Sequence, residues 1–126
     1  MSVKVDLDEL AAKIGEYGFA YLVSVSTEGR AHVLAVTPDV VDGSVVLGGI
    51  GRHTLANVES NPVATLVWPP LELGGYSLLV DGTTTSDAEA ATVTVSPTKA
   101  ILHRPAPGED GKRVGNDCLD ISLNPL

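Results

Sequence analysis

The sequence predicts a mainly β fold, in which six antiparallel strands form a meander or Greek-key barrel with two short helices. From residue 19 onward, apolar residues alternate with polar ones at the period of a strand. Short turns rich in Gly and Asp separate successive runs, which favours antiparallel neighbours. Apolar residues recur at helical spacing in two places. One is the N-terminal segment, over about residues 7–17, and the other is an inserted helix that begins near residue 52 and precedes the fourth strand.

The length and composition indicate one domain with an aliphatic core. A chain of 126 residues is long enough to bury about two-thirds of its unfolded surface. Its hydrophobic share of 44% is typical of a globular protein, but only 4% of the residues are aromatic. The net charge of -8 makes nucleic acids and anionic membrane surfaces poor candidate partners.

Cysteine and histidine usage argues against disulfides and metal ligation. Cys118 is the single cysteine, which excludes an intramolecular disulfide framework and a cysteine-rich zinc site. His32, His53 and His103 are far apart in the sequence and show no metal-binding spacing, so no metal is expected. The first residues carry no signal-peptide pattern, and no apolar run approaches the ~20 residues of a membrane span. We therefore expect a cytoplasmic protein.

The first predicted element is an amphipathic helix over about residues 7–17. Asp6 can cap its N-terminus, with Glu9 completing a capping box, and Gly18 suits the left-handed residue that ends a helix. The apolar residues that share one face at helical spacing are Leu7, Leu10, Ala11, Ile14 and Tyr17. We expect this helix to cover one end of a sheet or barrel.

Six strands follow, separated by turn-forming residues. Their predicted ranges are 19–26, 31–37, 44–47, 63–68, 76–85 and 91–102. Residues 27–30 and 40–43 predict the first two turns. Asp81-Gly82 predicts a bend or bulge in the fifth strand, and Pro97 predicts an edge position or a kink in the sixth.

The domain organisation is simple. Residues 1–104 are predicted to form the barrel domain. Residues 105–126 are rich in Pro, Gly, Asp and Asn without periodicity, which predicts a C-terminal tail that is either an extended arm or partly disordered.

A glycine-rich loop, Gly48–Gly51, leads into the inserted helix at Arg52–Thr54, and Asn61-Pro62 is expected to end that helix. Glycines allow a sharp turn, and a helix N-terminus presents unpaired N–H groups and a positive dipole end that favour anions. The segment is neither a GxGxxG nor a Walker motif. Two interpretations stay open, a phosphate cradle and an ordinary turn between two strands.

Three further residues have two interpretations each. Trp68, the only tryptophan, is either a core or interface anchor or a wall against a planar ring. His103 and Arg104 end the last strand, where they are either solvated or at the rim of a ligand-binding barrel mouth. No GxSxG nucleophile motif is present, and no residue is assigned a catalytic role.

The order of elements is similar to that of the pyridoxamine 5′-phosphate oxidase-like split β-barrel family, over about Leu7 to Arg104. The resemblance is closest to the compact actinobacterial members, which use FMN or the deazaflavin coenzyme F-420. The segments that carry it are residues 19–25, Gly29, Asn57–Pro62 with the following Val63–Val67, and Val80–Gly82.

The resemblance implies a homodimer with two cofactor sites along the subunit interface. The cofactor, FMN or coenzyme F-420, would place its phosphate at the glycine-rich loop and its ring near the strand that carries Trp68. The end of the last strand could reach cofactor or substrate. The residues implied in cofactor binding are Gly49, Gly51, Arg52, His53, Thr54, Trp68, His103 and Arg104.

The chain departs from the family pattern at Thr54 and Ala56, where relatives often carry Lys and Arg. Each missing cation would remove a charge-assisted hydrogen bond of about 1.5–3 kcal/mol. Three hypotheses follow. The chain is a flavin- or deazaflavin-dependent oxidoreductase that acts on a small organic substrate, or it is a cofactor-less dimeric binding module. A haem-binding protein, with His32 or His103 as axial ligand, is the minor alternative.

Overall fold

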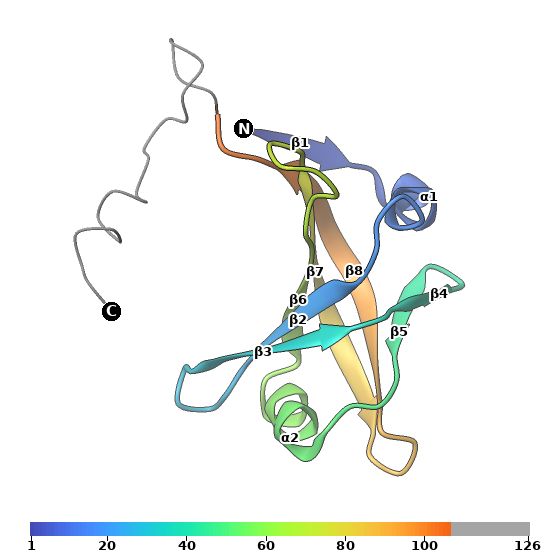
Figure 1. The fold of residues 1–126 in the computed structure, drawn as a ribbon. Coiled ribbons are helices and arrows are strands. Elements are labelled where there is room, and N and C mark those ends of the chain that lie inside the picture. The colour runs from blue at the N-terminus through green and yellow to red at the C-terminus, as the bar shows by residue number, and fades with distance from the viewer. Residues whose placement is uncertain (107–126) are drawn as a thin grey trace, which may run out of the picture.

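The computed structural model describes residues 1–106, which form one antiparallel sheet of eight strands with short helices beside it (Figure 1). The strands are β1 (Ser2–Val5), β2 (Ala20–Val25), β3 (Ala31–Val36), β4 (Asp39–Val41), β5 (Ser44–Leu47), β6 (Val63–Trp68), β7 (Ser77–Asp87) and β8 (Thr92–His103). The helical elements are the 3-10 turn η1 (Leu7–Glu9) and the helices α1 (Leu10–Ile14) and α2 (Arg52–Ser60). The predicted tail beyond residue 106, with Cys118, lies outside the described residues.

The sheet curls, and its two edge strands, β3 and β4, follow one another along the chain. The strand order is β3-β2-β6-β7-β8-β5-β4, and β1 pairs with the C-terminal part of β8. Only residues 37–38 separate β3 from β4, so the chain itself turns the corner between the two edges (Figure 1). Within residues 1–106 no ladder joins β3 to β4, and the predicted closure into a barrel is not confirmed.

The prediction of six strands missed β1 and β4. The four residues of β1 pair with Ala100–His103, about a hundred residues along the chain, and no local pattern encodes that partner. Two of the three residues of β4, Val40 and Val41, lay in the turn predicted over residues 40–43. The turn itself is at Asp42 and Gly43, with φ of 49° and 80°, which is the positive-φ pair that a tight hairpin requires.

The N-terminal helix is shorter than predicted and lacks the capping box. Asp6 makes no side-chain cap bond, because the first turn is a 3-10 turn in which the Glu9 amide donates to the Asp6 carbonyl at 2.9 Å. The helix ends at Gly15 instead of Gly18. The predicted apolar face is confirmed at its centre, where Leu10 and Ile14 are buried, whereas Leu7 is 45% exposed.

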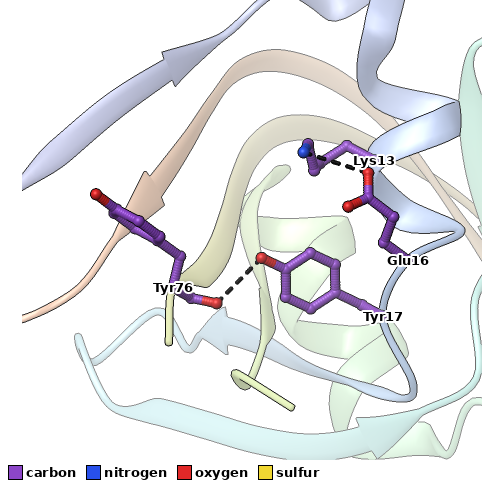
Figure 2. A network of polar contacts seen from close by, with 4 residues as sticks. All are labelled: Lys13, Glu16, Tyr17 and Tyr76. Atoms are coloured by element: carbon purple, nitrogen blue, oxygen red, sulfur yellow. Dashed lines mark hydrogen bonds and ion pairs between the residues drawn. The ribbon is translucent and has the colours of Figure 1, made fainter. Parts of the chain in front are cut away.

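A small polar network ties this helix to the start of β7 (Figure 2). The Tyr17 hydroxyl donates to the Tyr76 carbonyl at 3.0 Å, and Lys13 forms an ion pair with Glu16 at 3.2 Å. Burial raises the pKa of Tyr17; the Glu16 charge raises it further, and the Lys13 charge opposes the rise. The phenol therefore stays protonated as a donor, and the helix is anchored to the end of the sheet.

The later elements follow the predicted pattern closely. The ranges predicted for β5 and β6 match those observed, and α2 ends just before Asn61-Pro62 as expected. The register of β7 against β8 shifts between Asp81 and Gly82, which confirms the predicted bulge. Gly82 lies opposite Pro97 there, so the proline occupies an irregular position in the ladder.

The core lies on the inner face of the curled sheet. Its fully buried large side chains are Leu22, Val45, Leu47, Leu66, Trp68, Leu78, Val80, Val93 and Val95. Aliphatic residues dominate this set, as the composition predicts. Across residues 1–106, no helix has the length and apolar character needed to span a membrane.

Candidate functional site

The loop between β5 and α2 is held in one conformation by the sheet. Gly49 has a φ of 67°, a left-handed value that favours glycine. The Ile50 amide donates to the carbonyl of Ala91 at 2.9 Å, and the Ile50 side chain is buried. The loop is therefore attached to the turn that precedes β8, and it directs Gly51 into the helix.

The N-terminus of α2 has the properties of an anion site. Gly51 is the N-cap and provides no side-chain cap bond, and the first helical bond runs from the Leu55 amide to the Gly51 carbonyl at 3.1 Å. Among the residues that the structure describes, no acceptor is found for the amides of residues 52–54. Three donors at the positive end of the helix dipole therefore remain available to an anion.

The predicted side chains at this terminus are not equally available. Arg52 and His53 are exposed, so both can reach a ligand in front of the helix. Thr54 is 2% exposed and belongs to the packed face of α2. The cofactor contact that the resemblance implies for Thr54 is therefore left to its backbone N–H.

A hollow of about 430 Å³ adjoins the same loop. It lies where β3 turns into β4, between the two edges of the sheet. The residues that line it are Phe19, Leu34, Ala35, Val36, Thr37, Asp39, Gly48, Gly49 and Ile50. Of the predicted site residues only Gly49 is in this set. The sequence pattern missed the others because only the curl of the sheet brings β3 beside the loop.

Trp68 lies in the core and is 0% exposed. Its inward position on β6 follows from strand alternation with Leu66, which is also fully buried. The indole N–H has no hydrogen-bond partner among the described residues. Since no face of the ring is accessible, the interpretation of Trp68 as a core anchor fits this structure, and we leave the residue out of the candidate site.

β8 ends at His103, which Arg104 follows. This end of β8 is at the opposite end of the sheet from the loop between β5 and α2 (Figure 1). The loop bonds to Ala91 at the start of β8, whereas His103 ends that strand; at about 3.3 Å per residue the separation is roughly 35 Å along a straight strand. His103 Nδ1 is 3.1 Å from the Ser2 hydroxyl, and the Arg104 guanidinium lies 4.5 Å from the Tyr76 ring centre. One chain therefore does not bring them to the α2 terminus.

The outer face of the sheet carries an apolar row across four strands. Cross-strand pairing aligns Tyr21, Val67, Leu79 and Ile101, which we call the outer row. All four side chains are partly or largely exposed. The solvated face of an antiparallel sheet is normally polar, and contiguous apolar surface marks contact sites. The outer row is therefore a candidate contact surface.

Comparison with known proteins identifies close relatives in mycobacteria. The uncharacterized protein Mb0449c of Mycobacterium bovis and the uncharacterized protein MT0457 of Mycobacterium tuberculosis are each 39% identical to this chain over 130 residues. Each match covers 92% of this chain and 91% of the relative. No family model matches the chain.

Solved structures with the same fold bind different cofactors. An FAD binding protein from Mycobacterium smegmatis has a TM-score of 0.61 at 15% identity, covering 82% of this chain and all of its own. An F-420 reductase has a TM-score of 0.54 at 14% identity, covering 65% and 87%. A heme binding protein from Mycobacterium smegmatis has a TM-score of 0.59 at 17% identity, covering 80% and 55%. The chain therefore shares its fold with these three proteins.

Proposed function

This chain belongs to the same family as the uncharacterized mycobacterial proteins Mb0449c and MT0457, and from that premise and its split-barrel fold we propose that it is a flavin- or deazaflavin-dependent oxidoreductase. Its substrate would be a small organic molecule. A bound flavin or deazaflavin supplies hydride or electron transfer, while the protein supplies binding and position.

The observation that carries the proposal is the N-terminus of α2. Its three available amides and the exposed Arg52 and His53 would hold the cofactor phosphate. The neighbouring hollow of about 430 Å³, between β3 and the glycine-rich loop, offers space beside that phosphate. Gly49 and Gly51 would allow close approach, since no side chain projects from the loop there.

A titration with FMN and, separately, with coenzyme F-420, followed by fluorescence, tests the proposal. We expect saturable binding of one of them with one cofactor per subunit. Arg52→Ala should weaken that binding about 10- to 100-fold, because a charge-assisted hydrogen bond contributes about 1.5–3 kcal/mol. Lys13→Ala is the matched control: it also removes one cation, but Lys13 lies on α1, where it pairs with Glu16, outside the glycine-rich loop and the outer row, so affinity should not change.

The other hypotheses are outcomes of the same experiment. If neither cofactor binds at micromolar concentration, the absence of cations at Thr54 and Ala56 marks a cofactor-less binding module. A shift of the Soret band on haem titration, lost in His32→Ala or His103→Ala, would instead support haem binding. Unchanged cofactor affinity in Arg52→Ala would remove the phosphate assignment even if a flavin binds.

The protein would act as a homodimer with its outer rows in contact. In the strands that carry the row, Asp81 and Lys99 are cross-strand partners, so a two-fold arrangement can place opposite charges against each other. The outer row lies beside this pair in the same ladders, and a second copy would cover it. His103 and Arg104 would reach a cofactor only if such a dimer brings the far end of β8 to the other subunit's loop.

Sedimentation at micromolar concentration tests the dimer. Val67→Glu places a carboxylate in the outer row of both copies, and we expect the dimer dissociation constant to rise at least about a hundredfold, since like charges at an interface cost several kcal/mol. Val41→Glu is the control, because Val41 is 52% exposed on β4, outside the outer row. A monomeric wild-type protein, or a Val67→Glu variant that still dimerises fully, would contradict the proposal.

A further inference from the structure

Four polar side chains from three elements meet beneath α2. His32 is on β3, Ser24 on β2, and His53 and Asn57 on α2. The two imidazole rings have centroids 6.4 Å apart and are tilted by 40°. The Asn57 amide donates to the Ser24 hydroxyl at 3.2 Å, and Ser24 is 0% exposed. We call these four residues the His32–His53 cluster.

Regular structure holds the cluster in place. Ser24 and His32 are directly opposite each other in the β2–β3 ladder. His53 and Asn57 are four residues apart on α2 and therefore share one face of the helix. Because Asn57 is bonded to the buried Ser24, that helix face is attached to the sheet at the point where the two histidines meet. The sequence spacing of the histidines, which argued against a metal site, gave no sign of this approach.

We propose that His32 and His53 bind one divalent transition-metal ion, of the class that includes Zn²⁺, Ni²⁺ and Cu²⁺. Imidazole nitrogen is a preferred ligand of these ions, with metal–nitrogen distances of about 2.0–2.1 Å. The centre of a coordinating ring then lies about 3.2 Å from the metal. Two rings that share one ion at a tetrahedral angle have centres about 5 Å apart. The observed separation is 6.4 Å, so the two exposed side chains must rotate toward each other by about 1 Å to share the ion.

The surroundings suit a cation with open coordination positions. Both histidines are exposed, so an ion can enter without rearrangement of the fold. The Asn57 amide uses its nitrogen toward Ser24, which leaves its carbonyl oxygen as a third ligand one turn from His53. No group of three or more His, Cys, Asp or Glu side chains gathers within residues 1–106, so water would complete the coordination. The net charge of -8 favours cation binding.

Isothermal titration with ZnCl₂, on the full chain in a buffer without phosphate, flavin or haem, tests this site. A Cys118→Ser background keeps the thiol from binding the ion. We expect saturable binding of one Zn²⁺ per chain. His32→Gln and His53→Gln should each lower the affinity at least about tenfold, because loss even of residues that only support a ligand costs 10- to 100-fold.

Two controls separate this site from general histidine binding and from the proposed cofactor site. His103→Gln should leave the affinity unchanged, because His103 is at the far end of β8. Arg52→Ala should also retain Zn²⁺ binding, although its affinity for the cofactor is expected to fall. The proposal is overturned if the parent protein shows no saturable binding, if either cluster variant binds as tightly as the parent, or if His103→Gln loses binding. Circular dichroism melts confirm that each variant is folded.

Discussion

Trp68→Ala is expected to lower the free energy of unfolding by about 3–5 kcal/mol, the range for truncation of a large buried aromatic residue. The side chain is 0% exposed and is the largest in the core. Its neighbour across the β6–β7 ladder, Leu78, is also fully buried. Urea unfolding followed by far-UV circular dichroism measures the loss, since the variant has no tryptophan fluorescence.

Two further variants make this result specific. Trp68→Phe should lose less than half as much, because it keeps part of the volume and removes an indole N–H that has no partner among the described residues. Leu73→Ala should change stability by no more than about 0.5 kcal/mol, because Leu73 is 97% exposed. A Trp68→Ala protein within about 1 kcal/mol of the parent would contradict the core assignment and revive the interpretation of Trp68 as a wall for a cofactor ring.

Gly82→Ala is expected to destabilise the fold by about 1–3 kcal/mol, as overpacking of a well-packed interior does. A Cβ atom at Gly82 would lie 2.6 Å from the carbonyl oxygen of Ser96 and 2.6 Å from a methyl carbon of Val95. Neither atom can move freely, because Val95 is paired with β5 on the other side of β8. The bulge between Asp81 and Gly82 therefore depends on the absence of a side chain.

The midpoint of urea unfolding, with the slope unchanged, measures this effect. Gly18→Ala is the matched control, because a Cβ atom there meets nothing within 4 Å and the backbone does not have a positive φ. We expect the control to stay within about 0.5 kcal/mol of the parent. Equal midpoints for Gly82→Ala and Gly18→Ala would show that β8 can move aside, and that the close approach does not constrain the sheet.

The sequence by itself determined the elements whose signals are local. Strand alternation bounded by Gly and Pro predicted β5 and β6, and Asn61-Pro62 predicted the end of α2. Asp81-Gly82 predicted the bulge. The sequence also predicted the glycine-rich loop and the helix that follows it, which begins at Arg52, but it left open whether the loop is a phosphate cradle or an ordinary turn. Each of these features depends on backbone preferences and periodicity within a few residues.

The tertiary structure alone decided which segments meet. It added β1, whose partner β8 is about a hundred residues along the chain, and it replaced the Asp6 capping box with a 3-10 turn. It separated His103 and Arg104 from the loop by the length of β8. It buried Trp68 in the core, where the sequence had left two interpretations open. It also brought the ring centroids of His32 and His53 to 6.4 Å from each other. Local patterns indicate which face of a strand is apolar, but the pairing of strands distant in sequence decides what covers that face.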